Sequence, residues 1–252
     1  MPMTLAIIMT PPRRPFKTRV WLILALSTDP HLTDMVSYGC LPLMKETLSH
    51  RFNPLRTVEF GGLMKVLFGI EIEPQSQERI RDIRRCLKEN PALNAFLYIN
   101  HLAYSDPGPA MHVAHLIDPW QKRKIVALAS HFYMYKNDVK AYAALIKIGQ
   151  IAGVFPVAAI QTYQVGDPAF GYSQADVSAN YRAILTTFRQ LHQEGPLIVL
   201  ASPEGHRSDT PQLQAQVETG MIGIGKQLKN VLYVPVGIQY SPTYDRDGLN
   251  IF

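Results

Sequence analysis

Two short polar segments of this 252-residue chain carry side chains that could do chemistry, and the first is Asn100-His101 followed by Asp106. A histidine acts as a base near neutral pH when one ring nitrogen faces the substrate and a carboxylate holds the other. The His-x4-Asp spacing leaves enough loop for Asp106 to fold back onto the His101 ring, so we interpret this pair as a general base. A plainer interpretation stays open, in which Asp106 caps a helix and His101 is a polar residue at the end of a strand.

The second segment spans residues 202–208 and contains Glu204, Gly205 and Arg207. It combines a carboxylate, a flexible glycine turn and a guanidinium, and arginine can hold two phosphate oxygens at once. The pattern Pro-Glu-Gly-x-Arg arises by chance far less often than a His-x4-Asp pair, so this segment is the more specific of the two. The alternative is an ordinary surface turn with an Arg–Glu ion pair.

Strands alternating with helices must position both segments. We expect helices at about 76–88, 106–116, 141–151, 174–192 and 213–228, and strands at about 95–99, 124–129, 154–157, 196–201 and 231–238. In particular, we expect Ser76 to cap the first of these helices. Strands separated by helices predict a single α/β domain with a largely parallel central sheet flanked by helices. Both polar segments follow a predicted strand directly, which places them at the carboxyl edge of the sheet, where such folds bind ligands.

The chain divides into an N-terminal segment, residues 1–75, packed on a core domain, residues 76–252. Basic residues alternate with apolar ones early in the first part, as they do in membrane-surface anchors: Arg13, Arg14, Lys17 and Arg19. A second basic cluster lies on the helix predicted after residue 76: Arg79, Arg81, Arg84, Arg85 and Lys88. The alternative for both clusters is a solvated face beside ordinary core residues.

The composition excludes several classes of protein. A hydrophobic content of 47% is too high for a disordered chain, and no apolar run approaches the roughly 18–20 residues that span a bilayer. Two cysteines, Cys40 and Cys86, form no disulfide framework and indicate reduced thiols in a cytosolic compartment. The net charge of +5 is mild and comes without any nucleic-acid-binding motif, so we expect no nucleic acid partner.

Together the two polar segments resemble the phospholipid and glycerol acyltransferase family, whose best-known bacterial members acylate lysophosphatidic acid. His101 and Asp106 match the family's first block, a catalytic His-x4-Asp. Residues 203–208 are similar to its third block, in which threonine is more usual at the position of His206. The resemblance covers roughly residues 80–240, and these two blocks carry most of it.

Two shorter stretches complete the family's order of four blocks: Gly-Val-Phe-Pro-Val at 153–157 and Val-Pro-Val at 234–236. The family usually has an arginine shortly after its second block, where it binds the phosphate of the acceptor, but residues 157–160 include no cation. The lysine that often precedes the glycine after the third block is also missing, since residues 218–219 are Glu-Thr. Arg207 is then the only motif cation for a phosphate, which weakens glycerol 3-phosphate and lysophosphatidic acid as candidate acceptors.

The resemblance implies an O-acyltransferase, similar to the 1-acylglycerol-3-phosphate acyltransferases. It would move a fatty acyl group from acyl-CoA or acyl carrier protein to a hydroxyl of a glycerolipid or lysophospholipid-type acceptor. His101 would be the general base and Asp106 would orient it, while Glu204 and Gly205 would shape the acceptor pocket and Arg207 would bind a phosphate. No metal and no bound cofactor is required. The implied partners are the acyl thioester, the lipid acceptor and a membrane surface, with the protein peripheral on the cytoplasmic face of the membrane.

Three other functions stay open. A serine hydrolase or thioesterase would need a Gly-x-Ser-x-Gly elbow, for which residues 171–175 are a poor substitute. A zinc enzyme could use His112, His115 and Asp118, which fall near one face of a helix. A non-catalytic lipid-binding relative would explain the missing cations, although such a protein has no need of a His–Asp pair.

Overall fold

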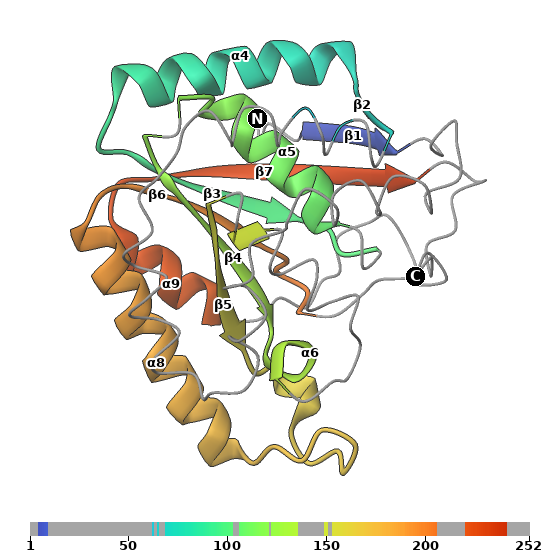
Figure 1. Ribbon diagram of the computed structural model, residues 1–252, viewed down its shortest axis with the longest axis vertical. Helices are drawn as coiled ribbons and strands as arrows, with labels where there is room; N and C mark the ends of the chain where they lie inside the picture. The colour runs from blue at the N-terminus through green and yellow to red at the C-terminus, as the bar shows by residue number, and fades with distance from the viewer. Residues whose placement is uncertain are drawn as a thin grey trace, which may run out of the picture.

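The computed structural model describes residues 5–9, 62, 65, 69–102, 106–120, 122–135, 149–150, 153–205 and 220–240. The strands in these ranges are β1 (Leu5–Met9), β2 (Ile70–Ile72), β3 (Asn94–Ile99), β4 (Lys124–Ser130), β5 (Val154–Ala159), β6 (Leu197–Ala201) and β7 (Val231–Tyr240). They form one seven-stranded sheet in the order β2-β1-β7-β3-β6-β4-β5 (Figure 1). Only the pair of β1 and β2 runs antiparallel, so the predicted α/β fold with a largely parallel sheet is confirmed.

Helices cover the sheet on both faces (Figure 1). They are α4 (Pro74–Glu89) and α5 (Pro107–Ile117) on one face, and α8 (Gln174–Gln193) and α9 (Gly220–Leu228) on the other. Two short helices follow the ends of β4 and β5: α6 (His131–Tyr135) and η3 (Thr162–Gln164). The arrangement therefore has three layers, with the parallel strands in the middle.

Each face of the sheet has its own hydrophobic core, because successive side chains of a strand point to opposite faces. On β3, Leu97 belongs to the core under α4 and α5, while its neighbour Phe96 belongs to the core under α8 and α9. Burial on both faces explains why the strands appear in the sequence as continuous apolar runs rather than as alternating patterns.

The first predicted helix starts earlier than expected. Glu73 occupies the N-cap position of α4 and Pro74 its first turn, whereas Ser76 lies inside the helix and is buried. The predicted cap at Ser76 was therefore wrong. Proline is favoured at the first position of a helix because its φ is already helical and its missing N–H is not needed there, so Pro74 sets the start.

The remaining predicted elements agree closely wherever the structure describes them. Helix α8 begins after Ser173, whose side chain accepts a hydrogen bond from the Asp176 N–H in a capping box. Strand β7 continues two residues beyond its predicted end, to Tyr240. Of the helix expected at 141–151, only residues 149–150 lie within the described part, and both are helical.

The N-terminal segment contributes two strands to the sheet, since β1 lies parallel to β7 and antiparallel to β2. Its basic cluster at residues 13–19 and its cysteine at position 40 lie outside the described residues. Among the helices that the structure describes, none is both long and apolar enough to cross a membrane.

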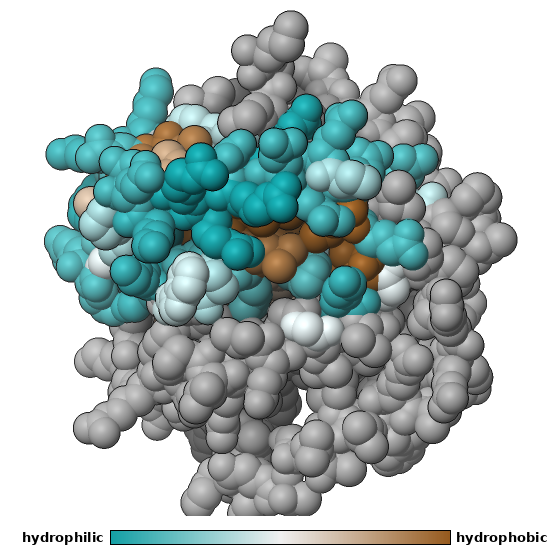
Figure 2. All heavy atoms as spheres, turned by 90° about the horizontal axis from the view of Figure 1, so that it is seen from above, coloured by the Kyte–Doolittle hydropathy of each residue, from teal (hydrophilic) through white to brown (hydrophobic). Residues whose placement is uncertain are grey.

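The second basic cluster follows α4 along the outer surface of the molecule. Figure 2 shows this surface from above, with hydrophilic side chains over most of the coloured area. Arg81, Arg85 and Lys88 are exposed, while Arg84 is half-buried and donates from Nε to the carbonyl oxygen of Leu116 at 2.8 Å. Acidic residues are interleaved with them on the same helix, so the charge on this surface is mixed.

A buried arginine closes the end of α4. Arg123 is only 2% exposed, and its guanidinium donates to the carbonyl oxygens of Leu87 and Asn90 at 2.8 and 2.9 Å and to that of Leu93 at 2.7 Å. Its backbone N–H donates to Asp118 Oδ2 at 2.9 Å. The Leu87 carbonyl cannot receive a helical N–H because the residue four positions later is Pro91, so Arg123 supplies its donor and ties the end of α4 to the chain that follows.

We expect Arg123→Met to lower the free energy of unfolding by about 3 kcal/mol, because it removes the donor to the buried Leu87 carbonyl and the ion-pair partner of the buried Asp118 carboxylate. Urea denaturation followed by circular dichroism measures this change. Arg85→Met is the matched control, since Arg85 pairs with Asp82 on the exposed side of α4, where such a pair contributes under about 1 kcal/mol. Equal stability of the two variants would contradict the structural role of Arg123.

Candidate functional site

The two polar segments predicted to carry chemistry meet at the carboxyl edge of the sheet. Strands β3 and β6 are parallel neighbours, so the loops that leave them lie side by side. The backbone N–H of His101, after β3, donates to Glu204 Oε2, after β6, at 3.1 Å. Glu204 is buried, and this hydrogen bond joins the two loops directly.

The predicted contact between His101 and Asp106 is present. His101 Nδ1 lies 2.8 Å from Asp106 Oδ2, and the backbone N–H of Leu102 donates to the same oxygen at 2.6 Å. The Asp106 residue is 4% exposed and the His101 side chain 27% exposed. A carboxylate at Nδ1 favours the tautomer that carries its proton there, which leaves the lone pair of Nε2 for a substrate.

The plainer interpretation of Asp106 as a helix cap does not hold. Asp106 stands at the N-cap position of α5, but its side chain forms no capping hydrogen bond with that helix. Its carboxylate turns back toward the loop and binds His101 and Leu102 instead. Pro107 at the first position of the helix lacks an N–H, which reduces the need for a cap.

Two further residues, Tyr240 and Asn100, hold the site together, and the sequence did not indicate this role for either of them. The hydroxyl of Tyr240, the last residue of β7, donates to Asp106 Oδ1. The side chain of Asn100 binds the backbone of Ile238 twice, through Nδ2 to the carbonyl at 2.9 Å and through Oδ1 from the N–H at 2.6 Å. Asn100 thereby extends the contact between the chain after β3 and strand β7 by one residue beyond the end of β3. The sequence signal for Tyr240 was the apolar residue at every second position from 234 to 240, but the predicted strand ended at Ile238.

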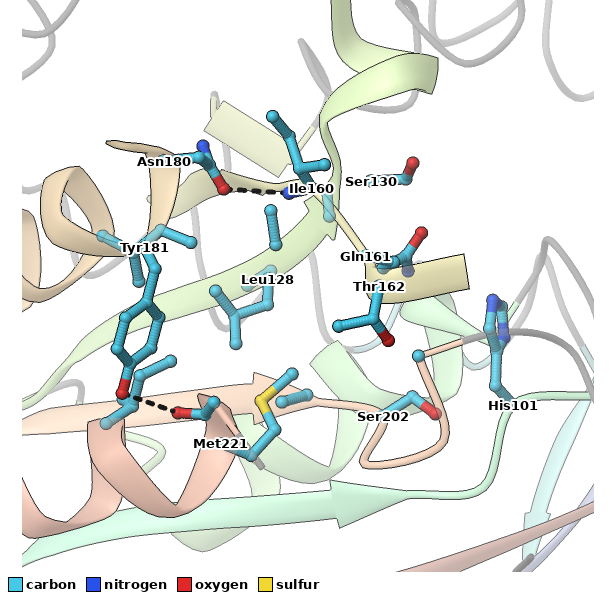
Figure 3. Close-up of a pocket in the computed structure, with 18 of the residues that line it drawn as sticks. His101, Leu128, Ser130, Ile160, Gln161, Thr162, Asn180, Tyr181, Ser202 and Met221 are labelled. Carbon is cyan, nitrogen blue, oxygen red and sulfur yellow. Dashed lines mark hydrogen bonds between the residues drawn. The ribbon is translucent and has the colours of Figure 1, made fainter. Parts of the chain in front are cut away.

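A cavity of about 890 Å³ opens beside the His–Asp pair. His101 and Asp106 line it together with residues of β4, β5, β6, α5, α6, η3, α8 and α9, and Figure 3 shows His101 on one side. Its apolar lining includes Leu128, Ile160, Ile184, Leu200, Met221 and Ile224, and its uncharged polar lining includes Ser130, Gln161, Thr162, Asn180 and Ser202. Among the described lining residues, Asp106 is the one acidic side chain and His101 the one histidine, and none is a lysine or an arginine.

Tyr181 lies on the side of the cavity away from His101 (Figure 3). Its ring rests against α9, where a Cβ on Gly223 would lie 1.8 Å from the hydroxyl oxygen of Tyr181. Glycine at position 223 is therefore required for this packing.

Next to Tyr181, Asn180 ties α8 to the end of β5, because its Oδ1 accepts from the Ile160 N–H at 2.9 Å and its Nδ2 donates to the Ala158 carbonyl at 3.0 Å.

The remaining predicted site residues lie in the loop after β6. Gly205 lines the cavity and has a φ of +71°, a conformation that other residues rarely adopt. Its N–H bonds to the Ser202 carbonyl at 3.4 Å, which closes the turn. Arg207 lies outside the described residues.

The three residues considered for a zinc site are buried around α5 and its end. Asp118 binds Arg123, and His115 donates from Nδ1 to the Met111 carbonyl at 2.5 Å. Burial lowers the pKa of His115, although this hydrogen bond and the nearby Asp118 act in the opposite direction. Within the described ranges, no group of three His, Cys, Asp or Glu side chains is placed to hold a metal ion.

Comparison with known proteins assigns no family: no family model matches the chain, and no curated protein is significantly similar to it in sequence. The chemistry of the site is therefore inferred from its own side chains, an imidazole held by a buried carboxylate beside a largely apolar cavity.

Proposed function

We propose that this protein is an O-acyltransferase that moves a fatty acyl group from acyl-CoA or acyl carrier protein to a hydroxyl of a glycerolipid or lysophospholipid-type acceptor. The observation that carries the proposal is the contact of His101 Nδ1 with the buried Asp106 carboxylate at the side of an apolar cavity. The resemblance of the two loop segments to the phospholipid and glycerol acyltransferases supports the same reaction.

The proposed reaction is a single acyl transfer. Nε2 of His101 takes the proton of the acceptor hydroxyl while that oxygen attacks the thioester carbonyl, and Asp106 stabilises the imidazolium that forms. The tetrahedral intermediate then collapses, the C–S bond breaks, and the imidazolium returns the proton to the departing thiolate sulfur. The products are an ester and a free thiol, and the step needs no metal and no bound cofactor.

The cavity suits the acyl chain. Apart from the His–Asp pair, the described lining has no charged side chain, so an alkyl chain bound there would remove water from no other charge. Each methylene that the cavity buries contributes about 0.8 kcal/mol, which is about fourfold in kcat/KM. The thioester carbonyl would lie next to His101, with the end of the chain toward Tyr181.

The acceptor is proposed to enter along the loop after β6. Glu204 holds this loop against the backbone of His101, and Gly205 lets the loop pass close to the cavity. Arg207 would bind the phosphate of an acceptor that has one. Basic residues at 13–19 would keep the protein at the cytoplasmic face of the membrane, where a lipid acceptor resides.

The direct test incubates the purified full chain with labelled acyl-CoA or acyl carrier protein and a panel of lyso-lipid acceptors with and without phosphate. Formation of an acylated lipid supports the proposal, and the preferred acceptor defines the role of Arg207. Free fatty acid as the sole product identifies a thioesterase instead. No turnover together with binding to liposomes identifies a non-catalytic lipid-binding protein.

The cavity wall predicts a limit to chain length. Tyr181→Ala removes the ring on the side away from His101, so we expect the preferred acyl chain to become longer by several methylenes, with about fourfold in kcat/KM for each methylene newly buried. Competition among acyl-CoA species of increasing length measures the shift. Tyr135→Ala, which removes an exposed ring outside the described cavity lining, should leave the preference unchanged. The same optimum in both variants would show that Tyr181 does not limit the chain.

A further inference from the structure

We infer that Tyr240 is a positioning residue for the general base, the outer member of a Tyr240–Asp106–His101 chain of hydrogen bonds. Tyr240 belongs to β7, outside the loops after β3 and β6 that supply His101, Asp106, Glu204 and Gly205. Its catalytic meaning rests on the proposed function, whereas its effect on the His101 ring can be measured without turnover.

The Asp106 carboxylate receives donors on both oxygens. Oδ2 accepts from His101 Nδ1 and from the Leu102 N–H, and Oδ1 accepts from the Tyr240 hydroxyl. Asp106 and Tyr240 are 4% and 9% exposed, so water has little access to replace a lost donor. Rotation of the carboxylate would break at least one of these bonds, which fixes the oxygen that faces His101.

Strand β7 is a rigid support for the Tyr240 hydroxyl. It pairs with β3 on one side and with β1 on the other, and Met9 of β1 is the partner of Tyr240 itself. Two residues before Tyr240, the backbone of Ile238 binds the Asn100 side chain in both directions. Asn100, the residue before His101, therefore holds the strand that carries Tyr240. The hydroxyl of Tyr240 in turn binds Asp106, the partner of His101.

The hydrogen bonds assign Tyr240 a role that acts through Asp106. Loss of its hydroxyl would leave Oδ1 buried without that donor and let the carboxylate turn, so that the imidazole would sample more orientations. A general base must hold its geometry closely, because small displacements of a reacting group reduce the rate strongly.

The test replaces Tyr240 with phenylalanine, which keeps the ring and removes only the hydroxyl. We expect kcat to fall about 10- to 100-fold, with the KM for the thioester within about twofold of the wild-type value. In an Asp106→Asn background the same substitution should produce little further loss, because Tyr240 acts on the base through Asp106. Independent losses that multiply in the double variant would overturn the inference.

A second readout needs no substrate. Protein labelled with ¹⁵N-histidine should give an Nδ1–H signal for His101, assigned by its loss in His101→Gln, and we expect this signal to shift or broaden in Tyr240→Phe. An unchanged signal would overturn the inference even if the wild-type protein transfers no acyl group. A changed signal in a protein without turnover would support the positioning role and reject only the proposed function.

Tyr233→Phe is the matched control. Tyr233 lies on the same strand, is 50% exposed and stacks on Tyr98, with 5.7 Å between the ring centroids. Its position in β7 places it on the opposite face of the sheet from Tyr240. Both kcat and the His101 signal should match the wild type in this variant, and a change equal to that in Tyr240→Phe would reject the specific role of Tyr240.

Discussion

Replacing His101 with alanine is expected to lower kcat for acyl transfer about 10²- to 10⁴-fold, the range in which a positioned general base accelerates such reactions. His101 is held at Nδ1 by Asp106 and lines the cavity, so the variant loses the group that takes the proton of the acceptor hydroxyl. Binding of the acyl chain should persist, because the apolar walls come from other residues. Initial rates with labelled acyl-CoA measure the loss, and equilibrium binding of a non-hydrolysable acyl-CoA analogue measures what remains.

His192→Gln is the control for this experiment. His192 lies in the last turn of α8, close to the point where the chain enters β6 at the opposite edge of the sheet. Its replacement should leave the rate within about twofold, since it has no place in the proposed chemistry. If His101→Ala turned over substrate at the wild-type rate, His101 could not be the general base, and the proposed reaction would lose its basis.

Asp106→Asn is expected to lower kcat about 10²- to 10⁴-fold, no more than the loss of His101 itself, because Asp106 acts through His101. The carboxylate accepts from His101, Leu102 and Tyr240, and an amide can replace it only by placing its NH₂ group toward one of these donors. The Tyr240 hydroxyl can turn to accept from the NH₂ group, which leaves the amide oxygen for His101 and Leu102. The shape of the site then survives, but the imidazolium loses the negative charge that stabilises it.

Asp82→Asn is the matched substitution on the surface, where Asp82 forms an exposed ion pair with Arg85 on α4. It should change neither the rate nor the stability by a measurable factor. Near-wild-type turnover by Asp106→Asn would mean that the contact between His101 and Asp106 is structural. The products of His101→Ala and Asp106→Asn are analysed in parallel. Loss of ester formation in both variants indicates a transferase, whereas loss of fatty acid release alone indicates a thioesterase.

Local sequence predicted the fold class well because both faces of the sheet are buried. Strands such as β3 and β6 appear as short apolar runs bounded by polar residues, and the helices between them follow a 3.6-residue period. The error at Ser76 arose because one residue type has several uses: Ser76 has the chemistry of a cap, yet Pro74 starts the helix. For the same reason Asp106 had two interpretations, and it stands at a cap position without capping.

Some of the site could not have been found from spacing along the chain. Glu204 lies 103 residues after His101 and Tyr240 lies 134 residues after Asp106, yet both pairs are joined by hydrogen bonds. No periodicity or short motif specifies such distances. Asn100 was recognised as part of a motif, but its role in holding β7 emerged only when the strand beside it was known.

The sequence by itself determined the local features of this protein: which segments are strands and helices, and that a histidine and an aspartate flank one short loop. Tertiary structure decided which loops meet. Strand order depends on how whole faces of helices and sheet pack together, and local sequence does not specify it. By placing β3 between β7 and β6, packing brought a glutamate, a tyrosine and an apolar cavity to one imidazole.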